Sequence, residues 1–160
     1  MSMTSAPNPT LSLTTIDGKT RSLDDWTTVF QQLWVVLPPK AESEIFIPVA
    51  EQIFKTFGDS DVRCAYLIPA GEQVAKKIME KTTLKAQCFL DEDGSICKAI
   101  GVSVTPSLVH IRQDTSVAHI ANGFSEDSWN KTCEEIAKSI RWTTPQLSGF
   151  QNLGSAAFPL

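Results

Sequence analysis

The fold is decided by residues 32–58, which read QLWVVLPPKAESEIFIPVAEQIFKTFG. The segment Leu33–Leu37 is an unbroken apolar run, which is typical of a strand covered on both faces, as in parallel sheets. Two prolines end this run. Over Glu44–Phe57 the apolar residues recur every three or four positions, which predicts an amphipathic helix that ends at Gly58. Pro48 lies either at a first-turn position of this helix or at a kink within it.

The alternation of strand and helix continues along the chain. Short apolar runs predict further strands, and helical periodicity predicts further helices, the last of them capped by Ser125. This is an α/β order, with the first strands parallel and a final antiparallel hairpin at the edge. A smaller hairpin around Asp17-Gly18 and a short helix capped by Ser22 precede it. After residue 58 we expect strands over residues 62–68, 86–90, 107–112 and 117–121, and helices over residues 72–84, 95–100 and 126–141.

Length and composition describe one globular domain. The 160 residues are 42% hydrophobic, which suits a single core, so we expect a flexible leader over 1–10, a domain over 11–142 and a flexible tail over 143–160. The 14 basic and 18 acidic residues form no dense cluster, which disfavours nucleic acid and anionic membranes as partners. No apolar run reaches the length of a bilayer span, and no secretory signal is visible. We therefore expect a cytoplasmic protein with reduced thiols and no cofactor.

The chain has four cysteines, and no two of them form a CxxC pair. Without that spacing there is neither a zinc ribbon nor a dithiol redox motif, and we expect no metal site. Cys64 lies in an apolar strand and Cys133 on the apolar face of the last helix, which predicts inert core thiols. Cys88 and Cys97 flank a turn, so we expect them to be the more accessible pair and the possible redox thiols.

Three stretches, taken in order, resemble the thioredoxin-like superfamily, and most closely its cytochrome-maturation thioredoxins and peroxiredoxins. Leu11–Trp26, which ends DGKTRSLDDW, is similar to the hairpin that those proteins place before the core. Phe89–Val102 resembles their inserted strand and helix, and Val104–Val109 resembles the segment that carries the family's cis-proline. The resemblance implies a three-layer α/β/α fold with a mixed central sheet, an N-terminal hairpin and an inserted strand and helix.

In redox-active members of the family, the CxxC pair follows the first core strand at the start of the first long helix, which lowers the thiol pKa. When Pro48 is matched to the helix proline of those relatives, Lys40, Ala41, Glu42 and Ser43 stand at this position. Lys40 replaces the attacking cysteine and Ser43 the resolving one, and no cysteine precedes Cys64. A serine hydroxyl without a paired base cannot replace the thiolate. Alternatively, these residues are only a solvated helix start with Ser43 as its cap.

The family resemblance also implies that Pro106 is cis and that the adjoining backbone pairs with an extended peptide. We therefore expect a peptide groove formed by Lys40–Ser43 together with Thr105 and Pro106. The leading hypothesis is a thioredoxin-like protein without dithiol activity that binds another protein or a peptide, for instance as the partner of a redox protein. One alternative is a thiol oxidoreductase or peroxidase that uses Cys88 or Cys97. Another is a small-ligand site at the former active-site position. The missing CxxC favours a non-enzymatic role, and the sequence does not define the oligomeric state.

Two further features carry weaker hypotheses. A turn of even length within residues 113–116 would place Arg112 opposite Val117 and His110 opposite His119, where two imidazoles can sense pH or bind a metal weakly. The final 18 residues contain apolar side chains in a polar stretch, which would suit a segment that docks on another protein or packs back on the domain.

Overall fold

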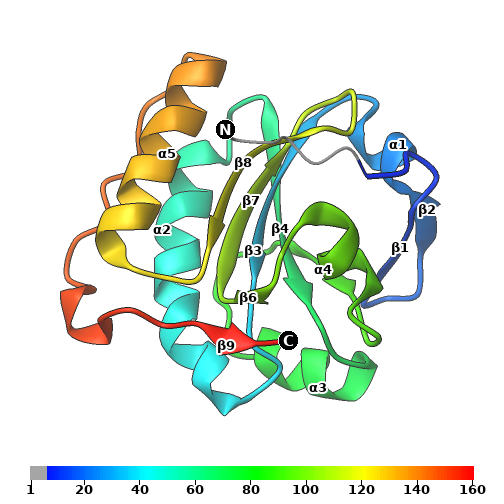
Figure 1. Ribbon diagram of the computed structural model, residues 1–160, viewed down its shortest axis with the longest axis horizontal. Helices are drawn as coiled ribbons and strands as arrows, with labels where there is room; N and C mark the ends of the chain where they lie inside the picture. Colours follow the sequence, from blue (N-terminus) through cyan, green and yellow to red (C-terminus); the bar gives the residue numbers. More distant parts are fainter. Residues whose placement is uncertain (1–6) are drawn as a thin grey trace.

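The computed structural model describes residues 7–160, and among them a seven-stranded mixed sheet forms the centre of the molecule (Figure 1). The strand order is β2-β1-β5-β4-β3-β7-β8. The pairs β3–β4 and β4–β5 are parallel, while β7 and β1 join the sheet antiparallel. The strands are β1 (Ser12–Thr15), β2 (Thr20–Ser22), β3 (Gln31–Val36), β4 (Val62–Ile68), β5 (Gln87–Leu90), β7 (Ser107–Ile111) and β8 (Val117–Asn122).

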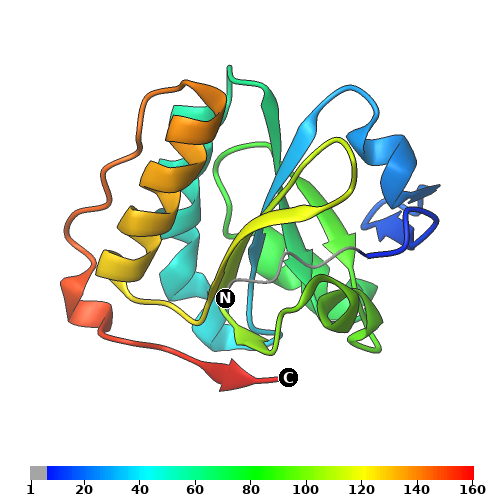
Figure 2. The same cartoon turned by 45° about the horizontal axis from the view of Figure 1, so that its top comes forward.

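Helices cover both faces of the sheet, which gives the three layers expected from the sequence (Figure 1, Figure 2). One core lies between the sheet and α2, α3 and α5, and it includes Phe54, Ile78 and Trp129. The other core lies beneath α1, α4 and the N-terminal hairpin, and it includes Trp34 and Phe89. The helices are α1 (Leu23–Thr27), α2 (Ile47–Phe57), α3 (Glu72–Met79), α4 (Ser95–Ile100) and α5 (Glu126–Ile140).

The expected helix starts agree with the structure where a side-chain cap was visible in the sequence. The hydroxyls of Ser22 and Ser125 accept hydrogen bonds from the third backbone N–H beyond them, at 3.1 Å in both cases. The first long helix differs, because a 3₁₀ segment, η1 (Ala41–Phe46), precedes α2, which places Pro48 in the first turn of the α-helix. A proline is tolerated there because its missing N–H would have no intrahelical partner.

Helix α3 ends earlier than the periodicity over residues 72–84 predicts. The carboxylate of Glu51 in α2 accepts hydrogen bonds from the backbone N–H groups of Thr83 and Leu84, both at 2.7 Å. These backbone donors are therefore satisfied by a neighbouring helix instead of by a continued α3. Residues 80–84 form turns that connect α3 to β5.

The two ends of the chain differ from the expected flexible segments. Residues 1–6 of the predicted leader lie outside the described residues, and Pro9 accepts a hydrogen bond from the Asp24 N–H at 2.9 Å. Residues 143–160 do not extend from the domain as a tail. They lie against it, because apolar side chains in the segment pack on the first core: Leu147, Phe150, Leu153, Ala156 and Phe158. The segment includes a 3₁₀ turn, η2 (Gln151–Leu153), and a short strand, β9 (Phe158–Pro159).

Candidate functional site

Residues 40–43, which the family resemblance matches to a dithiol, lie just after the carboxyl end of β3, where the chain enters η1. Lys40 is exposed and occupies the N-cap of η1 with extended backbone, and its carbonyl accepts a hydrogen bond from the Ser43 N–H at 3.0 Å. Ser43 is fully buried, and its hydroxyl has no hydrogen-bond partner among the described residues. Ser43 is therefore not the helix cap that one interpretation of the sequence expects. Glu42 is exposed, and no sulfur is present at this position.

The peptide bond between Thr105 and Pro106 is cis, and both residues are buried. They join the two-residue strand β6 (Val104–Thr105) to β7. One side of β6 forms a separate, two-stranded antiparallel sheet with β9, in which Thr105 pairs with Phe158 and Val104 with Pro159. Figure 1 shows β9 lying along β6, with the carboxyl terminus beside it. The expected peptide edge is thus paired with the end of the same chain.

Phe158 connects the two parts of the predicted groove. Its ring centroid lies 5.7 Å from the Lys40 ammonium nitrogen, and its backbone carbonyl lies 3.4 Å from the Thr105 hydroxyl, which donates to it. A cation that faces an aromatic ring at this distance is attracted by the quadrupole of the ring. The structure therefore places Lys40 and Thr105 around the same residue, Lys40 on its ring and Thr105 on its backbone carbonyl.

Two hollows adjoin this position. One, of about 180 Å³, lies between the chain end and the loops around Pro39, Pro69 and Gly94. The other, of about 430 Å³, lies between η1 and α3, and its rim carries both signs of charge. Its lining residues are Lys40, Ser43, Glu44, Val74, Lys77, Ile78, Glu80 and Lys81. The ammonium group of Lys81 lies 3.8 Å from the Glu44 carboxylate, so part of this charge is already paired.

The expectation that Cys88 and Cys97 form the accessible pair is wrong. Both side chains are fully buried, and they belong to cores on opposite faces of the sheet, so a disulfide cannot join them in this fold. The buried carboxylate of Asp91 accepts a hydrogen bond from the backbone N–H of Cys97 at 2.8 Å. This contact holds the start of α4 so that Cys97 faces inward. Cys64, expected to be an inert core thiol, is the more accessible one, and Cys133 is buried as expected. All four are free thiols.

The two histidines lie opposite each other on β7 and β8, as the even-turn hypothesis requires. Their rings are stacked with centroids 5.2 Å apart. Val117, however, pairs with Ile111 and not with Arg112, because a bulge follows His110. Within residues 7–160, no group of three or more His, Cys, Asp or Glu side chains is arranged to hold a metal ion.

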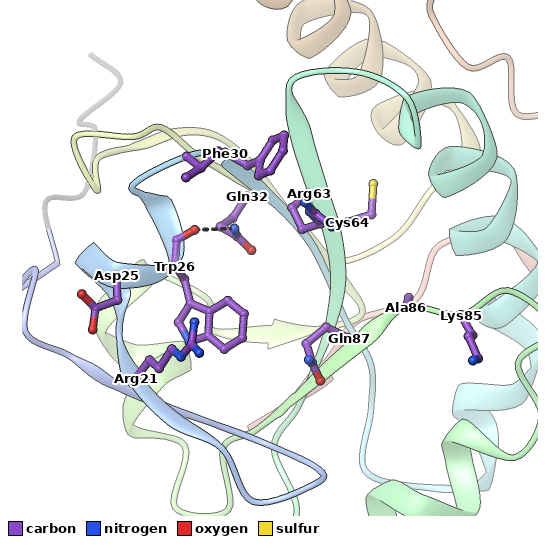
Figure 3. Close-up of a pocket in the computed structure, with 11 residues that line it drawn as sticks. Arg21, Asp25, Trp26, Phe30, Gln32, Arg63, Cys64, Lys85, Ala86 and Gln87 are labelled. Carbon is purple, nitrogen blue, oxygen red and sulfur yellow. Dashed lines mark hydrogen bonds between the residues drawn. The ribbon is translucent and has the colours of Figure 1, made fainter.

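A further hollow, of about 640 Å³, lies between the N-terminal hairpin and the amino-terminal ends of β3, β4 and β5, and no motif in the sequence indicated it (Figure 3). The guanidinium of Arg63 lies 4.3 Å from the centroid of the Phe30 ring, and that of Arg21 lies 5.6 Å from the Trp26 ring. Cys64 contributes to the wall. The cations come from separate strands, so only the folded sheet brings them together.

Comparisons with known proteins place this geometry within one fold. No protein-family model matches the sequence, and no curated protein matches it. Solved structures do resemble it, including a protein described as the thiol:disulfide interchange protein DsbE of Chlorobium tepidum, at 14% identity and TM-score 0.72 over 88% of this chain and 99% of that one. A PrxQ mutant from Xylella fastidiosa matches at 12% identity and TM-score 0.69, over 87% and 98% of the two chains. An uncharacterized thioredoxin-like protein from Porphyromonas gingivalis matches at 16% identity and TM-score 0.67, over 87% and 95%.

The chain therefore has the thioredoxin-like fold, and the structures that it resembles include thiol–disulfide oxidoreductase and PrxQ types. This confirms the architecture that the sequence resemblance implied, including the hairpin and the inserted strand and helix. In the part of the chain that the structure describes, no helix is long and apolar enough to cross a membrane.

Proposed function

We propose that this protein is a thioredoxin-fold binding module that recognises extended segments of partner proteins at the edge of β6 and carries no catalytic dithiol. One observation carries the proposal: this edge, next to Pro106, accepts an extended strand in antiparallel pairing. Addition of a strand to a free sheet edge is a common mode of peptide recognition, because main-chain hydrogen bonds provide affinity and side-chain contacts provide selectivity. Here Lys40 would supply the selective contact.

The placement of the thiols supports binding over redox chemistry. The start of the first long helix has Lys40 and Ser43 where a dithiol would act, and the Ser43 hydroxyl has no hydrogen-bonded base among residues 7–160. The alternative, an oxidoreductase that uses Cys88 or Cys97, requires an accessible thiolate. Burial raises the pKa of the Cys88 thiol to about 12 and that of Cys97 well above its usual range, where the nearby Asp91 adds to the effect.

The proposal is tested by titrating the isotope-labelled protein with synthetic extended peptides and following its backbone amide signals. We expect peptides with an aromatic side chain to shift the signals of Lys40, Val104 and Thr105. In a chain without Phe158–Leu160, where Phe158 no longer occupies the Lys40 contact, Lys40→Glu should weaken binding about five-fold, because a cation–π contact contributes about 1 kcal/mol at an exposed site. Lys131→Glu, an exposed charge reversal on α5, is the matched control and should leave binding unchanged. Peptide shifts that cluster elsewhere, or equal effects of the two charge reversals, would contradict the proposal.

A further inference from the structure

The segment after α5 returns across the surface of the domain and ends at the β6 edge (Figure 1, Figure 2). Polar contacts to α2 and α5 hold the first part of this segment in place. The last residues extend only a short distance beyond these contacts. These contacts are Trp142 Nε1–H to the Thr56 carbonyl at 2.7 Å, the Asn130 amide to the backbone of Leu147 at 2.8 and 3.0 Å, and the Phe150 N–H to the Glu126 carboxylate at 2.6 Å.

A second attachment lies immediately before the final strand. Phe124 and Ala156 exchange two backbone hydrogen bonds, of 2.7 and 2.9 Å. Gly123 makes this approach possible, because a Cβ at this position would lie 3.2 Å from the Ala156 carbonyl oxygen and 3.4 Å from the Ala157 Cβ. Its φ of +81° also favours glycine. The backbone before α5 is thus shaped to receive the returning segment.

Of the last three residues, Phe158 packs on the first core, whereas Pro159 and Leu160 are exposed. Phe158 is half-buried between Thr105 and Lys40, Pro159 is exposed opposite Val104, and Leu160 is 53% exposed. Proline suits this place, because the outer strand of a pair need not donate a hydrogen bond at every position. A two-residue strand pair on the surface is weak by itself, so its occupancy depends on the upstream attachments that keep it nearby.

We propose that residues Phe158–Leu160 are an intramolecular ligand that closes the peptide edge, and that the partner is an extended segment in which an aromatic residue precedes a proline. This inference rests on the proposed function. The tail presents this pattern to β6, with the aromatic ring on Lys40 and the proline opposite Val104. A partner segment with the same pattern would replace the tail residue for residue, and binding would require the tail to leave.

The expected effect on affinity follows from tethering. A segment attached through a short linker has an effective local concentration in the millimolar range. A weak tail contact is then still occupied most of the time, and a competing peptide binds only to the open fraction. If the tail is in place about nine-tenths of the time, its removal should tighten peptide binding about ten-fold.

The test uses a fluorescently labelled peptide with the sequence of residues 154–160, GSAAFPL, and measures its anisotropy as protein is added. Four proteins are compared: the full chain, a chain lacking Phe158–Leu160, the full chain with Phe158→Ala, and the full chain with Gln151→Ala. Gln151 is an exposed tail residue whose side chain makes no hydrogen bond to any described residue, so the last variant is the matched control. A second peptide with alanine in place of the phenylalanine tests the aromatic contact.

We expect the shortened chain to bind the first peptide about ten-fold more tightly than the full chain, with Phe158→Ala also tighter and Gln151→Ala unchanged. The alanine peptide should bind the shortened chain more weakly. Equal affinity of the full and shortened chains would overturn the inference while leaving the proposed function intact. Absence of binding to a shortened chain with native circular dichroism would overturn the proposed function itself. If the shortened chain does not fold, Phe158→Ala provides the same comparison.

Size-exclusion chromatography tests the other source of the strand that pairs with β6, which is a second copy of this chain. A monomeric full chain agrees with an intramolecular tail. A dimer that becomes monomeric when Phe158–Leu160 are removed would show that the strand pairs with a neighbouring copy, and it would overturn the intramolecular assignment.

Discussion

The thiols of the folded protein are expected to react with an aromatic disulfide reagent about a thousand times more slowly than those of the denatured chain. Burial raises the pKa of Cys64, Cys88 and Cys133 to about 12 and that of Cys97 still further. Only the thiolate attacks a disulfide. At pH 8 a thiol with pKa near 12 is ionised in about one molecule in ten thousand, against about one in four for an ordinary thiol with pKa near 8.5.

The measurement is the rate of absorbance increase when the reagent is added with and without denaturant. Cys64 should account for the fastest of the slow phases, because it is the more exposed thiol and contributes to the wall of the hollow near Arg63. Cys64→Ser should remove that phase, whereas Cys88→Ser should leave it. Insulin reduction should be absent from both variants and from the parent protein. Rapid reaction of Cys88 or Cys97 in the native state, or insulin reduction that needs either of them, would instead support the oxidoreductase alternative.

The parts of the fold that the sequence predicts well are those in which local chemistry and tertiary packing agree. The segments Leu33–Leu37 and Val62–Ile68 supply the central strands β3 and β4, and all of their side chains except Arg63 and Cys64 are buried. Ser22 and Ser125 cap helices because their hydroxyls satisfy nearby backbone donors. Such contacts span only three residues, so they can be identified without knowledge of the rest of the chain.

The carboxyl-terminal segment packs back on the domain, which the sequence offered only as an alternative to a flexible tail, because its polar composition hides a regular spacing. Leu147, Phe150, Leu153 and Ala156 recur at every third position, and each packs against the first core. Their spacing was the available signal. The place where these side chains pack cannot be predicted from this spacing. The contacts of the segment reach back to α2, α5 and β6, up to 86 residues away in the sequence. Composition alone therefore favours disorder where long-range packing provides order.

Some features of the candidate site can likewise be predicted from the sequence, and others cannot. The absence of a cysteine from residues 40–43 can be seen directly in the sequence. The occupant of the neighbouring edge cannot, because it is defined by the pairing of Thr105 with Phe158 across 53 residues. The expected accessibility of Cys88 and Cys97 is wrong for a related reason. A turn lies between them, but the strand and the helix on either side of it bury one thiol on each face of the sheet.

The stacked histidines lead to the second large effect, a loss of stability in mild acid. His110 is fully buried, its Nε2 lies 2.6 Å from Gln31 Oε1, and its Nδ1 lies 2.9 Å from His119 Nδ1. With Nε2–H donating to Gln31, His110 Nδ1 accepts the Nδ1–H of His119, which is the arrangement of a neutral His110 ring. A second proton, on His110 Nδ1, would place an N–H group of His110 directly against the N–H group of His119. Burial, with the positive charges of His119 and Arg112, lowers the pKa of His110 to about 3.

Because the pKa of His110 is lower in the folded protein than in the unfolded chain, folding favours the neutral form of this ring. The unfolded chain binds the proton below about pH 6.5 and the folded protein does not until about pH 3, so stability falls as the pH decreases through that window. From pH 7 to pH 5 His110 alone should reduce the free energy of unfolding by about 2 kcal/mol. The pKa of His119 is also lowered, mainly by burial and against the attraction of Glu135, so it adds to the loss.

Chemical denaturation at pH 7 and pH 5 measures this difference in the free energy of unfolding. Between these two pH values the histidines are the side chains whose protonation changes most. They are the only two in the chain, and the carboxylates of Asp17, Glu51, Asp93 and Asp114, whose pKa values are lowered, titrate below this range. His110→Gln should destabilise the protein at both pH values but remove about 2 kcal/mol of the difference between them. His119→Gln keeps the buried ring and should retain most of that difference. A parent protein with equal stability at the two pH values would show that the buried ring is protonated as readily as a free one, because only a lowered pKa couples folding to acid in this range.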